Sequence, residues 1–264
     1  MSKVMAVANQ KGGVGKTTTS VNLAAVLVQM GYRVLLVDLD AQGNATMGLG
    51  VEKLEVERSA YDVLLGRCLM MDALVGVDAQ GLDLLPGNAD LTAVQVELLD
   101  RIGRERVLSE ALETCRDEYH FVIIDCPPAL NILTLNALVA ADSILIPMQC
   151  EYYALEGLTD LLGTLENVRE ILNPGLEIEG ILRTMFDGRS RLANEVSQQL
   201  VSHFGSKVFD TVVPRNVRLA EAPSHGVSIV AYDRNSRGAE AYVALAEELV
   251  RRNGAYGEGR EIEE

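Results

Sequence analysis

The chain has 264 residues, of which 48% are hydrophobic and only 5% aromatic, and its formal net charge is −15. This length suits one α/β domain built around a single core. No apolar run approaches the roughly 18 residues that a membrane-spanning helix requires. The four cysteines are far apart and lack the paired spacing of a zinc site or a disulfide framework. We therefore expect a cytoplasmic protein with reduced, mostly buried cysteines.

The first predicted elements are a buried strand over residues 4–8, a glycine-rich loop, and a helix that begins near Lys16 and ends at Gly31. Glycines leave the loop's backbone N–H groups free to converge on an anion, and the helix N-terminus adds unpaired donors. Lys16 would reach the β- and γ-phosphates of a nucleotide, and the Thr17 hydroxyl would bind Mg²⁺. The predicted nucleotide-binding residues of this loop are Gly12, Gly13, Val14, Gly15, Lys16, Thr17 and Thr18.

The loop departs from the pattern G-x-x-x-x-G-K-[ST], because Gln10 stands where the first glycine would be. An additional lysine, Lys11, precedes the glycines. Here the sequence resembles the deviant phosphate-loop family K-G-G-x-G-K-T-T, which includes partition ATPases, MinD-type division regulators and the nitrogenase iron protein. The resemblance implies an ATP-sandwich homodimer in which Lys11 touches the partner subunit's nucleotide. Lys11, Lys16 and Asp40 are then the expected catalytic residues.

A second buried strand, residues 33–38, ends in carboxylates at Asp38 and Asp40. Ligands of open α/β sheets lie at the carboxyl ends of strands, so we expect both carboxylates to face the bound phosphates. Such a group can hold Mg²⁺ through water or orient the attacking water; the alternative is that it only caps a turn. The resemblance gives Asp40 the water-activating role and leaves Asp38 without one. Ala41 stands where the family commonly has proline, which removes no reacting group.

Residues 45–118 carry no informative motif, although they predict a strand over residues 82–85 and helices over residues 90–101 and 104–116. The next clear signal is an apolar strand over residues 121–124 that ends at Asp125 and is followed by two prolines. Phosphate-loop ATPases use a strand-terminal carboxylate to hold the water shell of the metal. The predicted metal-site residues are therefore Thr17, Asp40 and Asp125.

Beyond this strand the pattern predicts a helix over residues 130–141, a strand over residues 143–148 and a long helix to about residue 172. Tyr152 and Tyr153, which precede the long helix, are candidates for an interface contact, but core packing is favoured. The last amphipathic helix runs over residues 236–252. We expect residues 1–252 to form the ATPase domain and residues 253–264, which are acidic and glycine-rich, to form a frayed tail.

Residues 209–223 resemble the P-R-N-x-x-L-x-E-A-P segment of chromosomal partition ATPases of the ParA/Soj type, and this resemblance covers nearly the whole chain. It implies that Pro214, Arg215 and Asn216 lie near the adenine. It also places Arg189, Arg215 and Arg218 on or beside the basic positions that hold DNA in the dimer; the alternative is that these arginines only solvate a surface. Residues 183–237 contain eight basic and five acidic residues, a local charge of +3 in an acidic chain.

The expected fold is a single-domain phosphate-loop NTPase with a mostly parallel, twisted sheet flanked by helices on both faces. The resemblance implies an ATPase that uses ATP and Mg²⁺ and is weak without its partner. Its ATP-bound homodimer would bind double-stranded DNA non-specifically and associate with the nucleoid, and a ParB-like protein would stimulate hydrolysis to segregate chromosome or plasmid DNA.

Two alternatives are less favoured. A MinD-like membrane-surface ATPase needs a basic amphipathic C-terminal helix, whereas residues 254–264 offer glycines and carboxylates that an anionic bilayer repels. A metabolic ATP-dependent enzyme would need a further catalytic constellation, which the sequence does not display.

Overall fold

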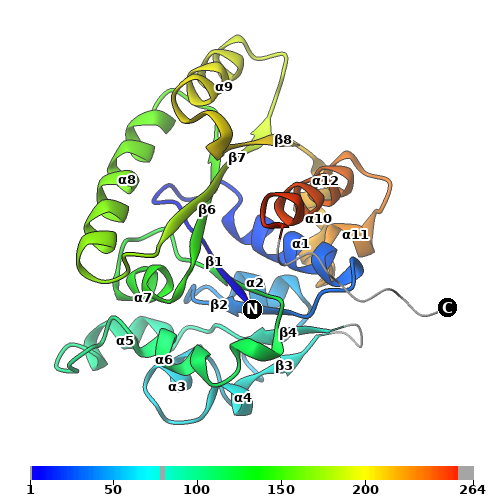
Figure 1. Ribbon diagram of the computed structural model, residues 1–264. Helices are drawn as coiled ribbons and strands as arrows, with labels where there is room; N and C mark the ends of the chain where they lie inside the picture. The colour runs from blue at the N-terminus through cyan, green and yellow to red at the C-terminus, as the bar shows by residue number, and fades with distance from the viewer. Residues whose placement is uncertain (1, 78–80, 255–264) are drawn as a thin grey trace.

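The computed structural model describes residues 2–77 and 81–254, and their strands form one eight-stranded sheet (Figure 1). The order across the sheet is β3-β4-β2-β5-β1-β6-β7-β8, and every neighbouring pair is parallel except β3 and β4. The strands are β1 (Lys3–Val7), β2 (Val34–Asp38), β3 (Val75–Gly76), β4 (Leu82–Leu85), β5 (Phe121–Asp125), β6 (Ser143–Gln149), β7 (Glu177–Phe186) and β8 (Val208–Pro214). The predicted fold class is confirmed.

The central strands are apolar throughout because each of their faces packs against helices. In β1, Val4 and Ala6 point into one core, whereas Met5 and Val7 point into the other. All four side chains are fully buried. The period-two geometry of a strand therefore explains why the sequence shows continuous apolar runs rather than alternation.

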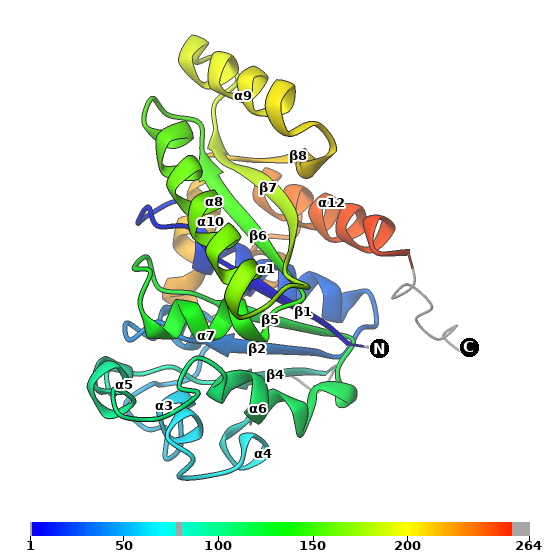
Figure 2. The ribbon, with the colours of Figure 1, turned by 60° about the vertical axis from the view of Figure 1, so that its left-hand side comes forward.

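Helices cover both faces of the sheet (Figures 1 and 2). One core is closed by α1 (Lys16–Gln29), α11 (Ile229–Tyr232) and α12 (Arg237–Arg252), with α2 (Asn44–Gly48) and α10 (Val217–Glu221) beside them. The other core is closed by α3 (Ala60–Leu64), α4 (Met70–Ala73), α5 (Leu91–Glu97), α6 (Val107–Glu113), α7 (Ile132–Ala140), α8 (Ala154–Ile171) and α9 (Arg191–Phe204). The 3₁₀ turns are η1 (Arg116–Glu118), η2 (Gly205–Lys207) and η3 (Ala222–His225).

The structure corrects several local predictions. The helices expected over residues 90–101 and 104–116 are shorter, at Leu91–Glu97 and Val107–Glu113. The preference for core packing of Tyr152 and Tyr153 was wrong: they are 74% and 70% exposed and pack edge to face on each other. Most of the acidic tail, residues 255–264, lies outside the described residues.

The prediction that the cysteines are mostly buried agrees with the structure. Cys115, Cys126 and Cys150 are buried and Cys68 is partly buried. Across the described residues, none of the helices combines the length and the apolar character needed to cross a membrane.

A buried carboxylate fastens the last helix to the edge of the sheet. Glu248 of α12 is 3% exposed and accepts hydrogen bonds from the backbone N–H groups of Asp210 and Thr211, each at 2.9 Å. The Thr211 hydroxyl and the Arg252 guanidinium donate to the same carboxylate at 2.7 and 2.6 Å. These contacts hold β8, which leads directly into residues 214–216.

We predict that Glu248→Gln lowers the free energy of unfolding by about 2 kcal/mol, because an amide NH₂ would face N–H donors that now meet a carboxylate oxygen. The matched control is Glu247→Gln, which changes the exposed neighbour on the same helix and should shift stability by less than about 0.5 kcal/mol. Urea denaturation of both variants tests this. Equal losses in the two variants would show that the buried carboxylate has no special role.

Candidate nucleotide-binding site

Three strands end level with one another at the carboxyl edge of the sheet. Val7 of β1 pairs in register with Asp125 of β5, and Asp125 pairs in turn with Asp38 of β2. The loops that follow these strands therefore start side by side. This register brings the glycine-rich loop and both strand-terminal carboxylates to one place, as expected for the ligand edge of an open α/β sheet.

The glycine-rich loop wraps the N-terminus of α1 in a conformation that depends on its glycines. Gly13 and Gly15 have φ angles of 72° and 88°, a region that side chains disfavour. A Cβ atom at Gly12 or Gly13 would meet nothing within 4 Å, so this side of the loop faces open space. The Thr184 hydroxyl supports the loop from β7 by donating to the Val14 carbonyl at 2.7 Å. The result is a cradle of backbone N–H groups.

Lys16 and Thr17 lie at the first turn of α1, between the loop and the sheet. The Lys16 ammonium donates to the Lys11 carbonyl at 3.2 Å, and burial lowers its pKa against the opposing effect of Asp125, Cys126 and Asp40. The Thr17 hydroxyl donates to Asp125 at 2.7 Å. An anion entering the loop would add a further counter-charge that favours the charged form of this buried ammonium.

A cavity of about 520 Å³ opens beside the loop and joins residues far apart in sequence. Its lining includes Gly12, Gly13, Gly15, Lys16, Thr17, Thr18, Asp40, Pro214, Arg215 and Asn216. The structure thus brings most of the predicted nucleotide-binding residues together. Val14 and Asp125 do not line the cavity. Val14 is buried, and its backbone carbonyl accepts the Thr184 hydroxyl. Asp125 is fully buried and accepts the Thr17 hydroxyl.

Several residues of this cavity were not predicted from the sequence, among them Thr184, Met185 and Tyr242. The sequence pattern predicts a strand only over residues 178–183, whereas β7 continues to Phe186. Met185 has a φ of 47°, the one positive value among non-glycine residues that the described chain shows. Such backbone strain often occurs at ligand sites but has no signature in a single sequence. Tyr242 comes from α12, whose amphipathic pattern predicted only core packing.

The carboxylates of Asp38, at the end of β2, and of Asp40, just after it, have different environments. Asp40 is partly exposed, lines the cavity, and also accepts the Gln42 N–H at 3.0 Å, so it both caps a turn and faces the site. Asp38 is fully buried and points instead at Thr46. The expectation that both carboxylates would face the phosphates was wrong for Asp38, because its oxygens are taken by backbone and hydroxyl donors.

Lys11 does not contribute to the lining of its own cavity. Its ammonium forms an ion pair with Glu151 at 2.5 Å, and both side chains are 44% exposed. The exposed Tyr152 and Tyr153 follow Glu151 directly. The additional lysine therefore lies on the protein surface, beside an aromatic pair.

The three arginines predicted to hold DNA all follow the carboxyl ends of β7 and β8. Arg189 pairs with Asp187 at 2.9 Å, and its hydrogen bonds hold the pKa of that carboxyl at about 2. Arg218 pairs with Glu221 at 2.9 Å and with Asp233 at 3.5 Å. Arg215 lines the nucleotide cavity. Arg215 therefore faces the nucleotide cavity, whereas Arg189 and Arg218 form ion pairs with neighbouring carboxylates.

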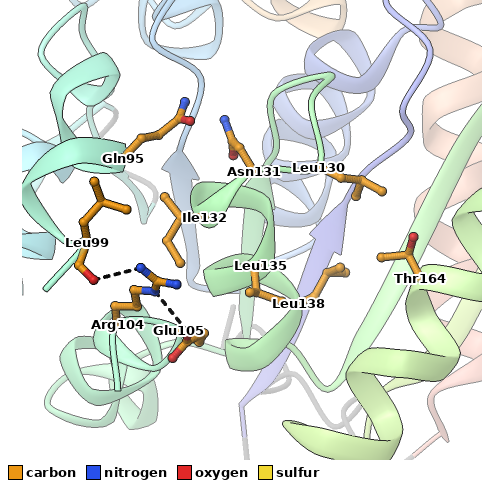
Figure 3. Close-up of a pocket in the computed structure, with 10 residues that line it drawn as sticks. All are labelled: Gln95, Leu99, Arg104, Glu105, Leu130, Asn131, Ile132, Leu135, Leu138 and Thr164. Carbon is orange, nitrogen blue, oxygen red and sulfur yellow. Dashed lines mark hydrogen bonds and ion pairs between the residues drawn. The ribbon is translucent and has the colours of Figure 1, made fainter. Parts of the chain in front are cut away.

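A second cavity, of about 560 Å³, lies between α5, α7 and α8 (Figure 3). Leu99, Leu130, Leu135 and Leu138 make its wall largely apolar, and Arg104 is paired with Glu105. None of the predicted site residues lines it. Leu130 and Asn131 follow the two prolines after β5, and Pro128 lines the nucleotide cavity, so the loop after β5 borders both cavities.

Burial raises the pKa of Asp125 to about 7, and the neighbouring Asp38 charge adds to this effect while hydrogen bonds from Thr17 and Ser20 oppose it. Burial also raises the pKa of Asp38 to about 6, against hydrogen bonds from Thr46. The described residues contain no cluster of three or more acidic, histidine or cysteine side chains able to hold a metal by themselves. A hydroxyl, scattered carboxylates and an open cavity fit Mg²⁺, which keeps several waters and binds with substrate phosphates.

These features define a phosphate-loop nucleotide-binding protein. Comparison with known proteins shows which family within this class the chain resembles. A family described as "AAA domain" matches residues 2–178. The chain is 53% identical to the sporulation initiation inhibitor protein Soj of Bacillus subtilis over 249 residues, which cover 94% of this chain and 98% of Soj.

Solved structures agree with this likeness. A Mycobacterium smegmatis protein described as cobyrinic acid a,c-diamide synthase, with a bound ATP analogue and magnesium, matches at a TM-score of 0.86 and 40% identity, covering 98% of this chain and 97% of that chain. The cell division ATPase MinD of Pyrococcus furiosus matches at 0.79 and 28% identity, covering 96% and 100% of the two chains. The chain belongs to the Soj/ParA family of chromosome-partitioning ATPases.

We predict that the nucleotide-free protein loses stability as the pH rises from 5.5 to 8. Because the folded-state pKa of Asp125 lies above its unfolded value of about 3.9, the folded protein holds an extra proton between roughly pH 4 and 7. The resulting stabilisation is complete below about pH 4, is lost as the pH rises through this range, and is gone above about pH 7. In Asp125→Asn this loss should shrink by about 2 kcal/mol. Chemical denaturation at both pH values checks it; an identical pH dependence in the two proteins would contradict the assignment.

Proposed function

We propose that this protein is an ATP-dependent dimerisation switch that binds DNA without sequence preference and hydrolyses ATP when a ParB-like partner stimulates it. Its cofactors are ATP and Mg²⁺, and its role is to segregate chromosome or plasmid DNA. The observation that carries this proposal is the position of Lys11, which belongs to the phosphate loop by sequence but lies outside the loop's own cavity. A lysine so placed is available to a nucleotide bound by a second subunit.

The residues around the cavity can be assigned roles in hydrolysis. The loop backbone and Lys16 would bind the phosphates, and Asp125 would hold Thr17 and the water shell of the metal. Asp40, which lines the cavity and keeps exposed surface, would orient the attacking water. Bound Mg²⁺ would supply charge neutralisation on the phosphate oxygens. Pro214, Arg215 and Asn216 line the same cavity and would contact the base, as the sequence resemblance implies.

The surface around Lys11 is suited to an interface between two copies. Glu151 neutralises Lys11 in the single chain, and Tyr152 and Tyr153 present aromatic surface next to this pair. Exposed tyrosines are frequent anchors of protein interfaces. In a symmetric dimer each subunit would use the same surface, so one set of residues would form both halves of the contact.

The DNA-binding part of the proposal depends on Arg189 and Arg218. Both belong to the segment of residues 183–237, whose net charge is +3, and both are exposed. A single segment of this charge is weak for DNA, but a dimer would present two, and each phosphate contact adds about −0.9 to the salt slope of binding. ATP would then control DNA affinity through dimerisation.

A MinD-like membrane ATPase is the second candidate, favoured by the structural likeness to MinD. The two candidates differ in the surface that the ATP-bound dimer contacts. Co-sedimentation with DNA and with anionic liposomes, in ATP and in ADP, separates them. Binding of the ATP-loaded protein to liposomes but not to DNA at low salt would contradict the partition proposal.

We predict that Lys11→Ala binds ATP as a monomer but no longer dimerises. The lysine lies outside the cavity of its own subunit, so nucleotide affinity should change by less than about threefold, a fraction of a kcal/mol. Light scattering after gel filtration with a slowly hydrolysed ATP analogue measures the mass. Lys207→Ala, at the opposite edge of the sheet, is the control and should dimerise normally. Dimerisation of Lys11→Ala at the wild-type concentration would refute this role.

We also predict that Arg189→Glu and Arg218→Glu weaken DNA binding and leave ATP-driven dimerisation intact. Each change removes one phosphate contact per subunit, so the slope of log K against log salt should flatten by about 2 in the dimer. Fluorescence anisotropy with duplex DNA at several salt concentrations measures it. Arg58→Glu, which makes the same charge change far from β7 and β8, should leave the slope unchanged. Wild-type slopes in both arginine variants would move the DNA face elsewhere.

A further inference from the structure

Asp38 is the buried group around which the loop carrying Asp40 is arranged. Its side chain is fully buried at the end of β2, and one oxygen, Oδ1, accepts the Asp40 N–H at 3.1 Å. The other oxygen, Oδ2, accepts both the N–H and the hydroxyl of Thr46, at 2.9 and 2.8 Å. One carboxylate thus fixes both ends of residues 40–46, the segment between β2 and the first turn of α2.

Thr46 extends this arrangement to a third segment of the chain. Its side chain is fully buried, and its hydroxyl oxygen accepts the Gly87 N–H at 2.9 Å while the hydroxyl proton is donated to Asp38. The hydroxyl therefore serves as donor and acceptor at once, a double role that serine shares and valine lacks. The loop after β4 is tied in this way to the loop after β2.

The backbone around Gly87 is packed too closely against Asp38 to admit a side chain at position 87. A Cβ atom at Gly87 would lie 2.6 Å from the Asp38 carbonyl oxygen and 2.9 Å from the Asp38 carboxyl carbon. A Cβ atom at Gly43, within the segment, would lie 2.6 Å from the Gly87 carbonyl oxygen. The absence of side chains at both glycines lets three backbone segments close around the carboxylate.

We propose that Asp38 and Thr46 are positioning residues for hydrolysis: they hold the backbone of Asp40 so that its carboxylate faces the nucleotide cavity. The partly exposed Asp40 has few contacts of its own beyond the Gln42 N–H, so its placement depends on the buried side of the loop. A displacement of about 1 Å in such a group can cost as much as two orders of magnitude in rate. This inference rests on the proposed role of Asp40.

The test compares hydrolysis with nucleotide binding in Asp38→Asn and Thr46→Val. The first replaces an acceptor oxygen with an NH₂ group that would face N–H or O–H donors; the second removes the hydroxyl at nearly constant volume. Single-turnover hydrolysis of Mg-ATP should fall by about tenfold or more in both variants. Affinity for a fluorescent ATP analogue should stay within about twofold, because the phosphate loop is untouched. Thr46→Ser, which keeps the hydroxyl, should hydrolyse within about threefold of the wild type.

A double-mutant cycle separates positioning from general destabilisation. If Asp38 acts through Asp40, then adding Asp38→Asn to Asp40→Ala should slow hydrolysis no further than Asp40→Ala alone. Thermal unfolding of every variant, with Gly157→Ala on α8 as a remote control, confirms that the proteins compared are folded. Additive losses in the cycle, or parallel losses of hydrolysis and nucleotide affinity, would overturn the positioning role.

These measurements distinguish failure of the proposed role of Asp40 from failure of the positioning role of Asp38 and Thr46. Wild-type hydrolysis in Asp40→Ala would remove the proposed role of Asp40, and this inference with it. Slow hydrolysis in Asp40→Ala, combined with wild-type rates in Asp38→Asn and Thr46→Val, would overturn only the positioning role. Should Asp38→Asn fail to fold, the comparison of Thr46→Val with Thr46→Ser gives the same decision.

Discussion

The arrangement of the nucleotide site depends on the register of β1, β5 and β2, which end at the same row of the sheet. Parallel pairing of Val7 with Asp125 and of Asp125 with Asp38 places a glycine-rich loop and two carboxylates within one row of the sheet. This arrangement is costly, since two buried acids lie on adjacent strands. Each acid is satisfied by a different segment, Asp125 by α1 through Thr17 and Ser20, and Asp38 by the loop before α2. The helix that carries the phosphate loop and the loop that carries Asp40 are thereby held to the same sheet edge.

Much of the fold could be predicted from the sequence because central parallel strands are apolar on both faces and end in recognisable polar residues. β4 and β5 match their predicted positions closely, and α1 begins at the expected Lys16. The phosphate loop was recognisable because its chemistry is contiguous in the chain. β8 is an edge strand in which Asp210 is exposed and Thr211, Val212 and Pro214 are only partly buried, so it lacks that continuous pattern and was not predicted as a strand.

The rest of the site was hidden because it depends on contacts between distant residues. Thr184 supports the phosphate loop from 170 positions away, and Tyr242 reaches the cavity from the last helix. No local pattern reports such contacts. Asp38 was predictable as a strand-terminal carboxylate, but its direction was not, since that is decided by Thr46 and Gly87. The exposure of Tyr152 and Tyr153 was mispredicted for a related reason. Aromatic character indicates burial, but an aromatic side chain can be buried against a partner chain instead of in the core of its own chain.

The ion pairs of Arg189 and Arg218 have a consequence for how the protein would respond to DNA. Each guanidinium already has a carboxylate partner, so a DNA phosphate would replace an existing anion rather than meet a bare cation. Such an exchange between exposed groups yields little net free energy for one arginine. Binding would become favourable only when many exchanges occur together on one duplex. Under the proposed function, the acidic neighbours would therefore set a threshold: a single subunit would bind DNA too weakly, and only the dimer would respond to it.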